Sequence, residues 1–201
     1  MDILMDMTRD KLSSYPVSFR RRYLDPALHW TPRYMSSYKR SPMTPLTPWI
    51  YFAGPLFTAA EIDFNAAIAT GLRAAGYSVY LPQEECAGIT DPHELFQICV
   101  RGIDGAALMV VMLDGTDADS GSCFELGYAY AKGMPVVGVR TDFRGSGEHL
   151  GLNLMLTHSC DRLLLTSLHP QPANPRIRYR GPNDPILPLL LDLLRGYSEL
   201  A

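Results

Sequence analysis

The sequence predicts an α/β fold in which a parallel sheet carries helices on both faces. From residue 49 onward, short apolar runs alternate with segments whose apolar residues recur at helical spacing. Glycine or proline punctuates most of these segments, and the connections between them are short. This alternation is typical of strand–helix–strand units with right-handed crossovers, but it leaves the strand order open.

The element boundaries follow from turn signals and helix-end signals. Gly76 and Gly133 are typical of helix C-termini, and Pro92 suits the first turn of a helix. No element is assigned to the proline-rich stretch 170–188 before the last helix. The five predicted strands are 49–53, 77–81, 106–113, 135–140 and 163–165, and the predicted helices are 59–75, 91–105, 122–132, 152–158 and 187–200.

The first 48 residues differ from the rest of the chain. Six prolines and an arginine run at 20–22 accompany no sustained helical or strand period. We therefore expect residues 1–48 to form an irregular, Pro-rich extension and residues 49–201 to form the folded domain. Met43 stands just before the first strand, which gives the hypothesis that natural translation starts there.

Composition places the chain among ordinary globular proteins. Of its 201 residues, 47% are hydrophobic and 19% are charged, and the net charge of −3 favours neither nucleic acid nor an anionic membrane. No apolar run reaches the ~18 residues of a membrane span, and the N-terminus lacks a signal-peptide pattern. The four cysteines show no paired or zinc-like spacing, so we expect reduced thiols and a cytoplasmic protein.

Carboxylates crowd the loop that follows the predicted strand 106–113. In open α/β sheets, ligands bind beside the carboxyl ends of the strands. The pair Asp119 and Glu125 suits glycosyl transfer, in which one carboxylate attacks an anomeric carbon and a second group assists the leaving and entering partners. The alternative is structural, with Asp119 capping the helix and Glu125 as a first-turn acid favoured by the helix dipole.

A second motif, Tyr51-Phe52-Ala53-Gly54-Pro55-Leu56-Phe57, ends the first predicted strand. Gly54 would let a ligand approach the backbone closely, although a tight turn explains it equally well. Neither a dinucleotide fingerprint nor a phosphate loop follows. The chain shows no cluster of metal ligands, and the carboxylate chemistry needs no metal or organic cofactor.

Taken together, three motifs resemble those of the nucleoside 2-deoxyribosyltransferase family. They are Tyr51-Phe52-Ala53-Gly54-Pro55, Asp119-Ser120-Gly121 with Glu125-Leu126-Gly127-Tyr128-Ala129, and Asn153-Leu154-Met155. The resemblance covers roughly residues 49–165. It implies a doubly wound, flavodoxin-like (Rossmann-like) three-layer sandwich with five parallel strands. It also implies an enzyme of nucleotide salvage that exchanges nucleobases on 2′-deoxynucleosides by a retaining ping-pong reaction.

The resemblance also implies roles for single residues. Glu125 matches the nucleophile that attacks C1′, Tyr51 the tyrosine that positions it, and Asp119 the aspartate that holds the sugar hydroxyls. Asn153 matches an asparagine that a neighbouring subunit lends to the sugar, which implies a homo-oligomer, a dimer or larger. Phe57 matches an aromatic residue near C2′. The motif residues Gly54, Gly121 and Met155 are expected at the substrate site.

One position departs from the family pattern. Cys99 stands where the family commonly has an aspartate that contacts or protonates the leaving base. A thiol with a pKa of ~8.5 is a poor acid for this purpose. Gln83 and Glu84, just past the second strand, are alternative base contacts, and Asp104 is an alternative acid one helical turn beyond Cys99.

Two other functions remain open at this stage. One is an N-glycosidase that hydrolyses (deoxy)nucleosides or their 5′-monophosphates. The loop after the first strand has no arginine to hold phosphate, although Arg140, Arg144 and Ser146 could supply a clamp. The other is a non-catalytic nucleoside- or nucleotide-binding module. Purine or pyrimidine preference, tolerance of ribose and oligomer size are not predicted.

Overall fold

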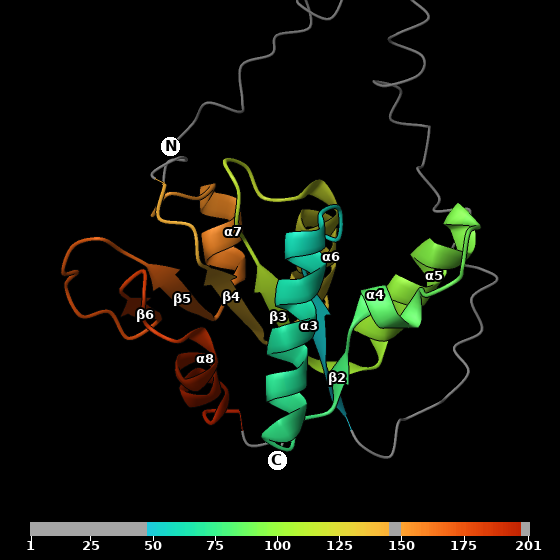
Figure 1. The fold of residues 1–201 in the computed structure, drawn as a ribbon, viewed down its shortest axis with the longest axis horizontal. Helices are drawn as coiled ribbons and strands as arrows, with labels where there is room; N and C mark the ends of the chain where they lie inside the picture. The colour runs from blue at the N-terminus through green and yellow to red at the C-terminus, as the bar shows by residue number, and fades with distance from the viewer. Residues whose placement is uncertain (1–47, 145–149, 198–201) are drawn as a thin grey trace, which may run out of the picture. The chain divides into compact units, whose positions relative to one another are not determined.

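The computed structural model describes residues 48–144 and 150–197, which form one six-stranded parallel sheet in the order β2-β1-β3-β4-β5-β6 (Figure 1). From β1 the chain first adds β2 on one side and then β3 to β6 on the other. The sheet is therefore doubly wound, with its switch point between β1 and β3. The predicted fold class is confirmed. The strands are β1 (Trp49–Ala53), β2 (Val79–Tyr80), β3 (Ala106–Met112), β4 (Val136–Arg140), β5 (Arg162–Thr166) and β6 (Ile177–Arg180).

The predicted strand count of five is wrong by one. The sixth strand, β6, pairs in parallel with β5 and lies in the stretch to which no element was assigned. It forms one edge of the sheet, so its sequence Ile-Arg-Tyr-Arg lacks the continuous apolar run of a central strand. The other edge strand, β2, has two residues instead of the predicted five because it pairs with β1 only there.

All five predicted helices are present, and a side chain caps the start of each except the last. Thr58 and Asp91 accept hydrogen bonds from backbone N–H groups of the first helical turns that follow them. A short helix at 82–85 was not predicted, because four residues carry no helical period. The helices are α3 (Ala59–Ala74), α4 (Pro82–Glu85), α5 (Pro92–Asp104), α6 (Ser120–Ala131), α7 (Leu154–Ser159) and α8 (Ile186–Leu194).

Helices cover both faces of the sheet and make three layers (Figure 1). One core cluster joins α3 and α8 to Ile50 and Phe52 of β1. The opposite cluster joins α5, α6 and α7 to Tyr51 and Ala53 of the same strand. Successive side chains of a strand point to opposite faces. This alternation places Tyr51 beneath α5 and α6.

The sheet is packed closely against its helices at Gly138 of β4. A Cβ added there would lie 2.8 Å from the Cys160 sulfur and 2.8 Å from Leu163 Cδ2. We expect Gly138→Ala to lower the free energy of unfolding by about 1–3 kcal/mol through overpacking. Gly127→Ala is the matched control, because nothing lies within 4 Å of its added Cβ and alanine favours a helix interior. Urea titration that found equal effects for the two variants would contradict this packing.

Several sequence predictions fall outside the described residues. They are the irregular extension, apart from Pro48, the hypothesis of a start at Met43, the place of Ser146 and the end of the last predicted helix. The described residues all belong to one compact unit, Thr44–Ala201. No helix in that described part is long and apolar enough to cross a membrane.

Candidate active site

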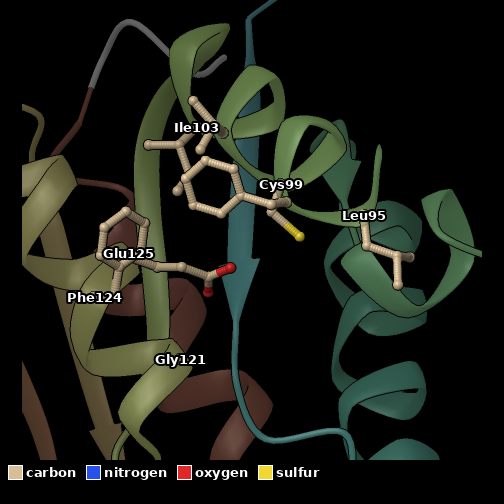
Figure 2. Close-up of a pocket in the computed structure, with 8 residues that line it drawn as sticks. Leu95, Cys99, Ile103, Gly121, Phe124 and Glu125 are labelled. Atoms are coloured by element: carbon tan, nitrogen blue, oxygen red, sulfur yellow. The ribbon is translucent and has the colours of Figure 1, made fainter. Parts of the chain in front are cut away.

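Tyr51 and Glu125, which are 74 residues apart, meet at the switch point of the sheet. Tyr51 is fully buried on β1, and its hydroxyl donates a 2.6 Å hydrogen bond to Glu125 Oε1. Figure 2 shows the Glu125 carboxylate extending from α6 toward β1. Because α6 begins at Ser120, Glu125 lies in the second turn. It is therefore not the first-turn acid of the structural alternative.

The surroundings of this pair raise the pKa values of both side chains. Burial raises the pKa of Glu125 to about 7, the hydrogen bond from Tyr51 opposes that rise, and the nearby charge of Asp119 adds to it. Burial, and then the charge of Glu125, hold the pKa of Tyr51 far above its usual value. Tyr51 therefore stays protonated as a hydrogen-bond donor at neutral pH, while Glu125 titrates near neutrality.

A cavity of about 200 Å³ opens beside Glu125, between α5 and α6. Its wall is mostly apolar, and Cys99 of α5 is the one thiol in it. Burial, followed by the charge of Glu125, raises the pKa of Cys99 to about 12. The residues that line the cavity are Leu95, Phe96, Cys99, Val100, Ile103, Gly121, Phe124 and Glu125 (Figure 2).

Asp119 caps α6, as the structural alternative predicted. Its Oδ2 accepts from the backbone N–H of Ser122 at 2.8 Å and from the Ser122 hydroxyl at 3.0 Å. A Cβ added to Gly121 would lie 3.1 Å from the same oxygen, so glycine leaves room for this bond. Both hydrogen bonds found for the carboxylate among the described residues use Oδ2. The cap thus leaves Oδ1 able to accept from a ligand.

The candidate base contacts have partners of their own. Glu84 forms a two-bond ion pair with Arg73, at 3.0 and 2.6 Å, on the exposed surface. Asp104 accepts from Tyr128 and pairs with Lys132. The Gln83 amide donates to the Ile62 carbonyl at 3.0 Å, whereas its buried Oε1 has no partner in the described part of the chain. Gln83 Oε1 therefore keeps an acceptor free, whereas Arg73 binds both carboxylate oxygens of Glu84.

The remaining candidates lie away from the cavity wall. Phe57 precedes α3 with 80% of its surface exposed. Asn153 caps α7 by accepting from the Met155 N–H at 2.8 Å, and both side chains are exposed. Gly54 packs tightly, since a Cβ there would lie 3.2 Å from Met112. The structure therefore brings Tyr51, Cys99, Gly121 and Glu125 together, but not these four residues.

The sequence analysis did not predict the hydrogen bonds by which Arg140 and Asp114 hold the acidic loop. Arg140, buried at the end of β4, donates to the carbonyl oxygens of Leu113 at 2.7 Å and of Gly115 at 3.1 Å. Asp114 accepts from the backbone N–H of Thr141 at 2.6 Å and of Asp142 at 2.9 Å. These bonds tie together the loops that follow β3 and β4. The feature of the sequence that could have indicated these bonds is a charged residue at the carboxyl end of each strand, Asp114 after β3 and Arg140 at the end of β4.

These hydrogen bonds determine whether Arg140 and Arg144 are free to bind a phosphate group. The Arg140 guanidinium is occupied by backbone carbonyls, and the side chain of Arg144 is paired with Asp142 at the surface. Arg140 is therefore not available in this conformation to hold a 5′-phosphate, and Arg144 would have to leave Asp142 to do so. Among the residues that the structure describes, no group of three or more metal-ligating side chains occurs.

Fold and site together define a doubly wound α/β protein with a half-buried, tyrosine-bound carboxylate at its switch point. Residues 50–155 match the model of the family described as nucleoside 2-deoxyribosyltransferase, and the chain belongs to this family. The family resemblance of the sequence motifs is thereby confirmed. A comparison with the curated proteins found no match.

Solved structures with a related fold include three that share 26% sequence identity with the chain. A conserved protein from Enterococcus faecalis V583 has a TM-score of 0.55, with 75% of this chain and 98% of that one covered. A 2-deoxyribosyltransferase from Bacillus psychrosaccharolyticus has a TM-score of 0.48, with 57% and 83% covered. A 2-deoxyribosyltransferase from Leishmania mexicana has a TM-score of 0.45, with 54% and 85% covered.

Proposed function

We propose that the protein transfers a 2-deoxyribosyl group between nucleobases through a covalent deoxyribosyl-Glu125 intermediate. The observation that carries this proposal is the Glu125 carboxylate, which is half-buried in the cavity wall and hydrogen-bonded at 2.6 Å by Tyr51. Burial removes water from around the carboxylate nucleophile, and the hydrogen bond from Tyr51 holds that carboxylate in one orientation. A pKa of about 7 keeps much of Glu125 ionised at neutral pH.

The reaction proceeds in two matched displacements. Glu125 attacks C1′ of the donor nucleoside, the glycosidic bond breaks and the first base leaves. A second base then attacks C1′ of the deoxyribosyl-enzyme and regenerates the Glu125 carboxylate. Two inversions give retention at C1′. Tyr51 orients the carboxylate in both steps and stays protonated throughout.

The remaining residues are proposed to bind the substrate. Asp119 Oδ1 accepts from a sugar hydroxyl, and the Gln83 Oε1 accepts from the base. Asn153 and Met155, exposed on this chain, complete the site of a second copy, so that the enzyme works as a homo-oligomer. Phe57, which is exposed on this chain, is proposed to pack against the deoxyribose when substrate binds, and Gly54 keeps the β1 turn narrow. Glu84 and Asp104 have no part in this site.

An exchange assay tests the proposal. Purified protein is incubated with 2′-deoxyinosine or thymidine, with and without free adenine or cytosine, and the products are separated by chromatography. A new deoxynucleoside that requires the second base supports transfer. Equal release of free base without an acceptor would instead establish hydrolysis, with water attacking the same intermediate. Binding of the nucleoside without any turnover would leave a binding module.

Asp119 can be tested separately in its two roles. Asn caps a helix about as well as Asp, so Asp119→Asn is expected to leave thermal stability nearly unchanged. Because the charged acceptor for the sugar is lost, KM for the deoxynucleoside should rise about 10- to 100-fold. Asp119→Ala should show the same rise in KM and a further loss of about 1 kcal/mol of stability. An unchanged KM in Asp119→Asn would reduce Asp119 to a cap.

A further inference from the structure

Breaking the glycosidic bond leaves an electron pair on a ring nitrogen of the base. An enzyme can neutralise that charge with a general acid within hydrogen-bonding reach, and an effective acid has a pKa near the working pH. The side chains beside Glu125 therefore decide which bases can leave. This question rests on the proposed function and concerns the same site.

The cavity wall offers no such acid. Its two titratable groups are Cys99 and Glu125, and Glu125 is joined to C1′ as the base departs. The Cys99 thiol, with a pKa raised to about 12, is a weaker acid than an ordinary thiol. Tyr51 is a weaker acid than a free phenol, and its proton is already shared with Glu125.

The other acids considered for the leaving base, none of which lines the cavity, do not supply one either. Asp119 does not line the cavity, and its Oδ2 caps α6. Glu84 is bound by Arg73, which lowers the pKa of Glu84, and Asp104 is paired with Lys132. Cys86, which contacts Cys99, has a pKa raised by burial. Gln83 carries an amide and cannot act as an acid.

We propose that the nucleobase leaves as an anion, without a proton from the protein, and that the enzyme selects 2′-deoxynucleosides whose bases best carry that charge. The C1′–N bond breaks with its electron pair passing to the base nitrogen, while Glu125 Oε forms the bond to C1′. The anion takes a proton from water after release. By microscopic reversibility, the acceptor base attacks C1′ as its anion and loses its proton to water beforehand.

The apolar wall strengthens this selection. Phe96 and Phe124 lie with their ring centroids 5.8 Å apart across the space between α5 and α6. A low-dielectric surface penalises a localised charge more than a delocalised one. Bases whose anions spread charge over carbonyl groups, as uracils and hypoxanthine do, are therefore favoured over cytosine, whose anion is less stable.

A series of 5-substituted 2′-deoxyuridines tests the proposal with little change in shape. The fluoro, bromo, unsubstituted and methyl members have bases of decreasing acidity at the glycosidic nitrogen. Base release is measured in a single turnover with enzyme in excess. We expect the rate to fall by about tenfold for each unit of increase in base pKa. The companion variant Cys99→Asp places a carboxyl group at the cavity, and it should flatten this dependence and accelerate the methyl member most.

Cys99→Ser is the matched control, because it changes the side chain without adding an acid, and its slope should equal that of the wild type. Active wild-type enzyme with rates independent of base acidity would overturn the proposal and leave the transferase function standing. A folded Cys99→Asp variant with an unchanged slope would also overturn it. Absence of base release from every member would instead contradict the proposed function. If Cys99→Asp fails to fold, the slope measured with the wild-type enzyme decides the test on its own.

Discussion

Replacing Glu125 with glutamine is expected to lower the single-turnover rate of base release by about 10⁴-fold or more. The amide keeps the shape of the side chain and still accepts the hydrogen bond from Tyr51. It cannot form the bond to C1′. Rapid-quench chromatography of released base measures the loss. Glu94→Gln, at an exposed position in the first turn of α5, is the control and should keep wild-type rates.

The same variant should be more stable than the wild type at alkaline pH. The folded-state pKa of Glu125, about 7, exceeds its ordinary value of 4.5, so folding favours the protonated form. The resulting stability is present below pH 4.5 and is lost as pH rises through 7. Glutamine cannot ionise, so Glu125→Gln should gain about 2–3 kcal/mol at pH 8.5 and almost nothing at pH 4.

Thermal unfolding at the two pH values checks this gain. The difference in unfolding free energy between Glu125→Gln and the wild type is compared at the two pH values. An equal difference at pH 8.5 and pH 4 would show that folding does not raise the pKa of Glu125. Glu94→Gln again serves as the control, since its carboxylate is exposed.

Tyr51→Phe is expected to lower kcat/KM near pH 7 by about 10- to 100-fold, because one directed hydrogen bond to the nucleophile is lost. The pH profile should move as well. The bond from Tyr51 lowers the pKa of Glu125, so its removal raises that pKa. The acid limb of kcat/KM, near pH 7 in the wild type, should shift to higher pH in the variant.

Tyr130→Phe provides the control for this shift, since Tyr130 lies on α6 with 62% of its surface exposed. Its acid limb should coincide with that of the wild type. A Tyr51→Phe limb at the wild-type position would show that the tyrosine does not tune Glu125. A uniform fall in rate at every pH would have the same meaning.

The fold was predictable because its central strands are continuous apolar runs between helical periods. Strand 106–113 and helix 59–75 appear almost unchanged as β3 and α3. The edge strand β6 was not predicted because it has a neighbouring strand on one side only, so polar residues are tolerated in it. Spacing left the strand order open, and the family resemblance implied only a doubly wound, flavodoxin-like sheet.

The site was predictable only in part, because its contacts join distant segments. No periodicity in the sequence could reveal that Tyr51 reaches Glu125 across 74 residues, and the resemblance supplied that pairing. Nor could the sequence show that Glu84 is held by Arg73 or that Arg140 is held by backbone carbonyls. Asp119 illustrates the limit, since the carboxylate that caps a helix is also the one proposed to bind the sugar.

Trapping of the deoxyribosyl-enzyme tests the central claim most directly. Enzyme is mixed with a 2′-deoxynucleoside donor in the absence of an acceptor base, quenched in acid, digested and mapped by mass spectrometry. We expect the mass of one deoxyribosyl group on the peptide that contains Glu125, lost when an acceptor base is added before the quench and absent from Glu125→Gln. Full base exchange with an unmodified Glu125 peptide, or the adduct on another residue, would contradict the account.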